Sequence, residues 1–153
     1  MTRMIGSEAA IPNPALKPLE FLVGQWRTEG SHPLMPGQSL HGHSTFAWAD
    51  GGAFLVWRSE IDEPGIPSAI AIFGTDDESK ECSMLYFDER GVSRRYSVAL
   101  RSDEWHWWRD APGFSQRFTA RLVDGGARMI GQGEMNRGDH WEPDLELTFT
   151  RIP

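Results

Sequence analysis

The sequence predicts an all-β fold: an antiparallel, up-and-down β-barrel of about ten strands with a short helical cap near the N-terminus. Three observations support this prediction. Turn-forming residues recur about every 8–12 residues, polar and apolar residues alternate in the stretches between them, and only one segment has the signals of a helix. Because closing a sheet removes its exposed edges, we favour a barrel over an open sheet.

The chain of 153 residues is long enough for one domain with a core or an enclosed cavity, without disulfides or metals. We expect residues 1–12 to form a flexible N-terminal segment and residues 13–153 to form the domain. The single cysteine, Cys82, excludes an internal disulfide and favours a reducing, cytoplasmic location.

Charge and hydropathy exclude several classes of partner. The 22 acidic and 15 basic residues give a net charge of -7, which argues against nucleic-acid binding because phosphate contacts need a basic face. No apolar run reaches the roughly 18 residues of a membrane span. The expected partner is a small molecule, and a homodimer stays open as an alternative to a monomer.

The helical cap is expected in residues 13–24. Asn13 suits the capping position, Pro14 the first helical position and Gly24 the end of the helix. Pro18 limits the segment to one or two turns, because it lacks the N–H that a longer helix requires. We expect this segment to cover one end of the barrel.

Eight segments contain residues that preset a turn or accept a positive φ. They are Pro36-Gly37, Asp50-Gly51-Gly52, Glu63-Pro64-Gly65, Asp76-Asp77, Glu89-Arg90-Gly91, Ala111-Pro112-Gly113, Asp124-Gly125-Gly126 and Arg137-Gly138-Asp139. The predicted strands begin near Trp26, Leu40, Ala53, Ser68, Cys82, Val92, Glu104, Phe114, Ala127 and His140.

Residues 92–100 and 114–122 alternate most clearly, as antiparallel strands with one wet face do. In residues 114–122, two Phe and one Leu share a face. In residues 92–100, Arg94 falls on the same face as Tyr96 and Val98. An arginine on an apolar face is informative, because an unpaired buried charge is costly.

Gly24-Gln25-Trp26 begins the first predicted strand, and Arg151 ends the last one. This pair resembles the signature of lipocalins, fatty-acid-binding proteins and their relatives, in which the Trp closes the barrel floor and the Arg packs across it. The resemblance implies that Trp26 and Arg151 join the first and last strands through a cation–π contact worth about 0.5–2 kcal/mol.

Three segments resemble a bacterial family of unknown function, DUF1579: Phe87–Arg94, Trp108–Phe118 and Trp141–Asp144. The resemblance covers most of the chain from Leu19 to Arg151. That family is related to the ten-stranded barrels of the nitrobindins and fatty-acid-binding proteins. The resemblance therefore implies a calycin-like barrel and no established chemistry.

The relatives also allow a test of cofactor binding. Nitrobindins hold haem through a histidine on the last strand, and the corresponding position counted back from Arg151 holds Asp144. A carboxylate is a poor substitute for the neutral imidazole that ligates haem iron. Fatty-acid-binding relatives use an Arg-x-Tyr pair, which Thr148-Phe149-Thr150 does not supply. We therefore predict no cofactor, and a haem protein is the least favoured alternative.

The predicted function is binding of a small, largely apolar ligand in the barrel cavity, with an acidic ligand as an open option, because aromatic walls and fixed cations suit such a molecule. The candidate walls are Trp57, Tyr86, Trp108 and Phe118. The candidate polar anchors are Arg95, Arg109, Gln116 and Asp144.

Two other functions stay open. An isomerase or hydrolase on the same barrel would use Asp144 with His106 as its acid and base. A module for protein interaction would have its interior packed solid. His41 and His43 share one face of a strand, but no third ligand is near them in sequence, so we predict no metal site.

Overall fold

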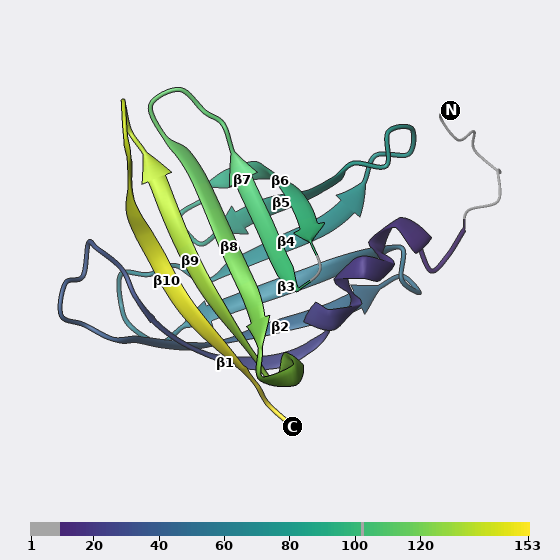
Figure 1. The fold of residues 1–153 in the computed structure, drawn as a ribbon, viewed down its shortest axis with the longest axis horizontal. Coiled ribbons are helices and arrows are strands. Elements are labelled where there is room, and N and C mark those ends of the chain that lie inside the picture. The colour runs from purple at the N-terminus through teal and green to yellow at the C-terminus, as the bar shows by residue number, and fades with distance from the viewer. Residues whose placement is uncertain (1–9, 102) are drawn as a thin grey trace.

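The computed structural model describes residues 10–101 and 103–153, and its ten antiparallel strands form a closed barrel (Figure 1). Each strand pairs with its neighbours in sequence, and β1 pairs with β10. The strands are β1 (Gly24–Ser31), β2 (Leu40–Ala49), β3 (Phe54–Ile61), β4 (Ala69–Thr75), β5 (Cys82–Asp88), β6 (Ser93–Arg101), β7 (Glu104–Arg109), β8 (Ser115–Val123), β9 (Arg128–Asn136) and β10 (Trp141–Arg151). This architecture confirms the predicted fold class.

The expected cap is a 3-10 helix, η1 (Pro14–Leu22), at the end of the barrel where β1 begins (Figure 1). The Asn13 side chain accepts a hydrogen bond from the backbone N–H of Ala15 at 3.0 Å. Three residues per turn put side chains three apart on one face, and the three buried ones are Leu16, Leu19 and Leu22. Of the described helices, none is long and apolar enough to cross a bilayer.

All eight predicted turns lie between consecutive strands, and a second short 3-10 helix, η2 (Asp124–Gly126), forms the turn after β8. Between β2 and β3, the φ angles of Asp50, Gly51 and Gly52 are 48°, 71° and 95°. Glycine adopts this left-handed region without a Cβ clash. A Cβ on Gly52 would also lie 2.7 Å from the side chain of Pro12. Of the segment predicted to be flexible, residues 1–9 lie outside the described residues.

The barrel interior has a packed half near η1 and an open half at the other end. A Cβ on Gly131 of β9 would lie 2.3 Å from the ring of Phe118, so this glycine makes room for that ring between the halves. The large aromatic side chains of the packed half are at most 1% exposed: Trp26, Phe46, Phe73, Trp105 and Phe149.

Arg151 joins the first and last strands at the packed end. Trp26 and Arg151 are paired residues of β1 and β10, and the guanidinium carbon lies 4.1 Å from the centre of the indole ring. Arg151 also donates to the backbone oxygens of Val23 at 2.8 Å and Phe21 at 2.7 Å. The Trp26 indole N–H donates to the oxygen of Leu22 at 2.9 Å. One side chain therefore fixes both strands and the end of η1.

Replacing Arg151 by Met should lower the free energy of unfolding by about 2–4 kcal/mol, because the carbonyls of Phe21 and Val23 lose a charged donor. Urea unfolding followed by tryptophan fluorescence measures this loss. The control is Arg128→Met, which removes an exposed ion pair with Asp124 and should change stability by less than about 1 kcal/mol. Equal effects of the two variants would contradict the role of Arg151.

Candidate functional site

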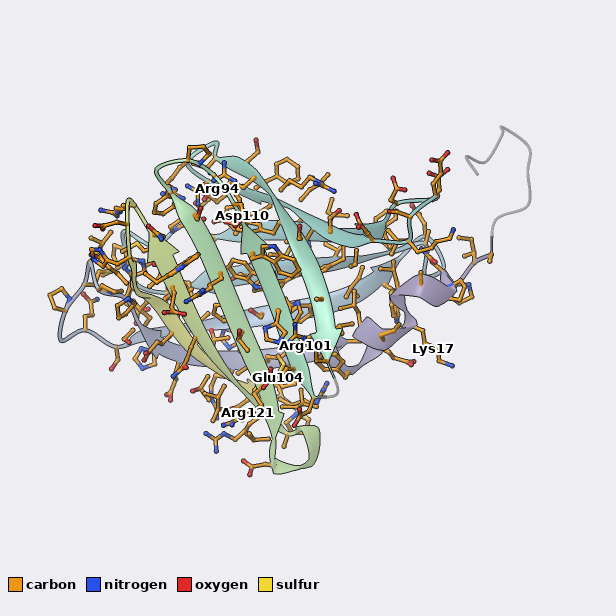
Figure 2. All side chains as sticks on the ribbon, turned by 45° about the horizontal axis from the view of Figure 1, so that its top comes forward. Lys17, Arg94, Arg101, Glu104, Asp110 and Arg121 are labelled. Atoms are coloured by element: carbon orange, nitrogen blue, oxygen red, sulfur yellow. The ribbon has the colours of Figure 1, made fainter. Side chains whose placement is uncertain are left out.

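The open half of the barrel contains a cavity of about 560 Å³, within the range of small-molecule sites of roughly 300–1,000 Å³. Its mouth lies at the end opposite η1, between the β1–β2 loop, the β3–β4 loop and the β5–β6 turn. Figure 2 shows Arg94 and Asp110 at this end, whereas Arg101, Glu104 and Arg121 lie at the other end. The residues that line the cavity thus include Arg94, at the end of the barrel opposite η1.

Aromatic rings form the floor and one wall of the cavity. Trp57 is stacked on Phe46 with the ring centres 5.2 Å apart, and Trp107 is stacked on Phe118 at 4.9 Å. Tyr96 packs edge-on against Trp107 at 4.7 Å. The Trp57 indole N–H donates to the Ser44 hydroxyl at 3.0 Å, which fixes the ring. Because these rings hold one another, the floor is a preformed apolar surface.

Arg94, Tyr96 and Gln116 form a polar cluster on the cavity wall. The Tyr96 hydroxyl donates to Oε1 of Gln116 at 2.9 Å, and Nη1 of Arg94 donates to the same oxygen at 3.3 Å. Burial raises the pKa of Tyr96, although Arg94 opposes this shift, so the hydroxyl keeps its proton at neutral pH. The cluster therefore presents donors to the cavity.

Two of the arginines that line the cavity have no carboxylate partner among the described residues. Arg94 and Arg137 lie beside the ring of Phe114, with their guanidinium carbons 5.4 Å and 5.7 Å from its centre. By contrast, Arg90 pairs with Asp88 at 2.7 Å and Arg117 with Glu134 at 2.9 Å. The mouth of the cavity thus holds positive charge that the described side chains do not neutralise.

Asp144 is the acidic residue that lines the cavity, and His32 contacts it. Nε2 of His32 lies 3.1 Å from Oδ1 of Asp144, and the backbone N–H of Leu34 donates to Nδ1 of His32 at 3.1 Å. Because Nδ1 accepts, the histidine proton is assigned to Nε2, which donates to Asp144. The carboxylate therefore ties the β1–β2 loop to β10.

Tyr86, Asp88 and Arg90 form a second polar chain at the mouth. The Tyr86 hydroxyl and Nη2 of Arg90 both donate to Oδ2 of Asp88 at 2.7 Å. Arg90 holds the pKa of the buried Asp88 well below its usual range, whereas burial raises the pKa of Tyr86 well above its usual range. Asp88 is therefore charged, and its charge is paired with that of Arg90.

The structure places the predicted site residues in two groups. Those that line the cavity are Trp57, Tyr86, Gln116, Phe118 and Asp144. Arg95 and Trp108 are exposed on the outer face of the barrel, because neighbouring residues of a strand alternate between faces. The inward positions belong instead to Arg94 and Trp107. Strand alternation in residues 92–100 is the signal that identifies Arg94.

Arg109 ends β7 directly across from Gln116 but is not among the residues that line the cavity. His106, the expected base of the enzyme alternative, lies on the opposite face of β7 from Trp105 and Trp107. There it contacts Glu104 at 3.0 Å and Thr119 at 2.9 Å. His106 and Asp144 are thus not brought together, and this expected pair is wrong.

The residues at this site do not fit a haem group. The position expected to ligate iron holds Asp144, whose oxygen already accepts a hydrogen bond from His32. His41 and His43 both point outward from β2. Within the described residues, no group of three or more His, Cys, Asp or Glu side chains is arranged to hold a metal ion.

The barrel is similar to solved structures, among them the crystal structure of Rv2717c from M. tuberculosis. The TM-score is 0.66 at 16% sequence identity, and the match covers 92% of this chain and 98% of that chain. This likeness shows the fold. Neither a protein-family model nor a curated protein matches the sequence.

Replacing Asp88 by Asn should lower the free energy of unfolding by about 1.5–3 kcal/mol at neutral pH, because Arg90 loses its charged acceptor. The folded pKa of Asp88 is depressed, so its contribution is full above the unfolded pKa of about 3.9 and declines as the pH falls below it. The deficit of the variant should therefore shrink between about pH 4 and pH 2. Urea unfolding at several pH values measures it, and a deficit independent of pH would contradict this account.

Proposed function

We propose that the protein binds a small, largely apolar ligand that carries an acidic group, in the open half of the barrel. The observation that supports this proposal is Arg94, a cation without a carboxylate partner among the described residues, beside an aromatic cavity of about 560 Å³. A partly buried charge is costly unless it is paired. The carboxylate of a ligand would supply that partner and would gain a charge-assisted hydrogen bond.

Neither of the other two functions has comparable support. A packed interaction module would leave no room for a ligand, whereas the open half of this barrel is hollow. The enzyme alternative needs Asp144 and His106 within reach of one substrate, whereas Asp144 lines the cavity and His106 lies on the outer face of β7, so this pair has no support. Binding is therefore the function that we retain.

We also propose, from the three sequence segments described above, that the chain is a member of the DUF1579 family and related to nitrobindins and other calycins. Its expected location is the cytoplasm, on the basis of its single cysteine. Native mass spectrometry of gently purified protein, followed by organic extraction, tests the binding proposal directly. A stoichiometric small acid released on extraction is the expected result.

A fluorescent probe can test the role of Arg94. We expect 8-anilino-1-naphthalenesulfonate to bind with an affinity reduced at least tenfold, about 1.4 kcal/mol, in Arg94→Met. Arg95→Met is the matched control, since Arg95 is the next residue and lies on the outer face. It should change the affinity less than twofold. A wild-type protein that is folded but binds neither this probe nor any extracted acid would refute the proposal.

The charge of Asp144 should oppose an acidic ligand. Asp144→Asn keeps an oxygen that accepts from His32 but removes the charge, so the sulfonate probe should bind about threefold to tenfold more tightly. N-phenyl-1-naphthylamine, the same probe without its sulfonate, should bind both proteins equally. Weaker binding of the sulfonate to the variant would show that Asp144 is itself an anchor for the ligand.

A further inference from the structure

Gln116 determines which chemical groups the cavity wall can bind. Its Oε1 accepts hydrogen bonds from both Tyr96 and Arg94, and these two donors fix the orientation of the amide. Its Nε2 group therefore points away from them, and it makes no hydrogen bond to another described residue. Beside it, the Arg94 guanidinium has further N–H groups and no carboxylate partner among the described residues. The wall thus offers donors, which recognise a carboxylate and reject a cation or a second donor.

These donors lie near the mouth, and the aromatic floor lies below them. Arg94 is the second residue of β6 and Gln116 the second residue of β8, both at the open end. Tyr96 and Phe118 follow two residues deeper on the same strands, a distance of about 7 Å along each strand. A carboxylate held by Arg94 and Gln116 would therefore stay close to solvent, while the rest of the ligand would point inward.

The depth of the cavity limits the apolar part of the ligand. On β6 and β8 the residues that line it end at Tyr96 and Phe118, which are 2% and 3% exposed. Below them, Trp105 packs edge-on against Trp57 at 5.3 Å and closes the path into the packed half. A depth of about 7–13 Å suits a flat, wide group and is too short for an extended long alkyl chain. The stacked rings of Trp107 and Phe118 favour an aromatic group.

The electrostatic balance of the lining agrees with an acid at the mouth. The acidic residue of the lining, Asp144, already accepts a hydrogen bond from His32. Arg90 and Arg117 are paired with carboxylates, whereas Arg94 and Arg137 are not paired among the described residues. A ligand carboxylate near Phe114 would lie close to both of these free guanidinium groups.

We infer that the ligand is a compact aromatic carboxylic acid, bound with its carboxylate at the mouth on Arg94 and the Gln116 amide and its rings on the floor formed by Trp57, Trp107 and Phe118. This inference rests on the proposed function and deepens it. It assigns the ligand class, the orientation of the ligand, and Gln116 Nε2 as a hydrogen-bond donor that recognises the carboxylate. It excludes long-chain fatty acids as the preferred ligands.

The first experiment is calorimetric titration with 2-naphthoic acid, 2-naphthalenemethanol and dodecanoic acid. We expect 2-naphthoic acid to bind at least tenfold more tightly than each of the other two, because the alcohol lacks the charge and the alkyl acid lacks the ring. Equal or tighter binding of dodecanoic acid would overturn the aromatic class, while the proposed function would stand. If none of the three binds and no acid is extracted, the proposed function fails as well.

The second experiment replaces Gln116 by Glu. The new carboxylate still accepts from Tyr96 and Arg94, so the fold should be kept, which the urea midpoint checks. The substitution replaces the amide N–H donor of Gln116 with a negatively charged acceptor, and it gives Arg94 a carboxylate partner. We therefore expect 2-naphthoic acid to bind at least thirtyfold more weakly. The matched control is Gln132→Glu on the exposed face of β9, expected to change affinity less than twofold. Unchanged affinity in a folded Gln116→Glu protein would overturn the assigned anchor.

The third experiment tests the orientation with extended ligands. 2-Naphthoylglycine lengthens the acid end, which faces solvent, and should keep its affinity within about fivefold of 2-naphthoic acid. A 6-hexyl-2-naphthoic acid lengthens the end that faces the floor and should bind at least tenfold more weakly than the parent acid. The reverse order of these two ligands would show that the acid lies at the floor and would overturn the inferred orientation.

Discussion

The contact between Arg151 and Trp26 is the constraint on which the rest of the barrel depends. A sheet of ten strands has two edges, and its first and last strands must pair before an interior exists. Arg151 links these strands and also donates hydrogen bonds to the carbonyls of Phe21 and Val23 at the end of η1. The packed end is therefore rigid, which leaves the opposite end as the place where the barrel can be hollow.

The sizes of the inward side chains decide where the cavity begins. Near η1 the inward positions hold Trp, Phe and Leu, whose side chains fill the space between the walls. Towards the mouth several are small, among them Ser59, Ala69 and Gly133. Phe118 marks the change, because its ring lies over Gly131, where no other residue would leave room. The cavity is therefore a consequence of side-chain volume along strands whose backbone geometry is regular.

Alternation and turn chemistry predicted the fold, because both are local properties of the sequence. They also put Arg94 on the inner face of its strand, whereas the choice of Arg95 and Trp108 as ligand contacts erred by one residue, which exchanges the two faces. Asp144 lines the cavity for a different reason. The register of β10 shifts between Pro143 and Glu146, so that Asp144 and Leu145 both line the cavity. No pattern in the sequence announces that irregularity.

The net charge of -7 would by itself repel an acidic ligand, yet the site argues for one. The two observations are compatible, because the effect of a charge on the ligand depends on its distance from the ligand. At physiological salt, charges more than about 8 Å apart are largely screened, so the exposed carboxylates of the outer face act weakly on a group inside the mouth. There the nearest charges decide, and Asp88 and Asp144 already have hydrogen-bonded partners while Arg94 lacks a carboxylate. A barrel that is acidic overall can therefore select an acid through the local cations Arg94 and Arg137.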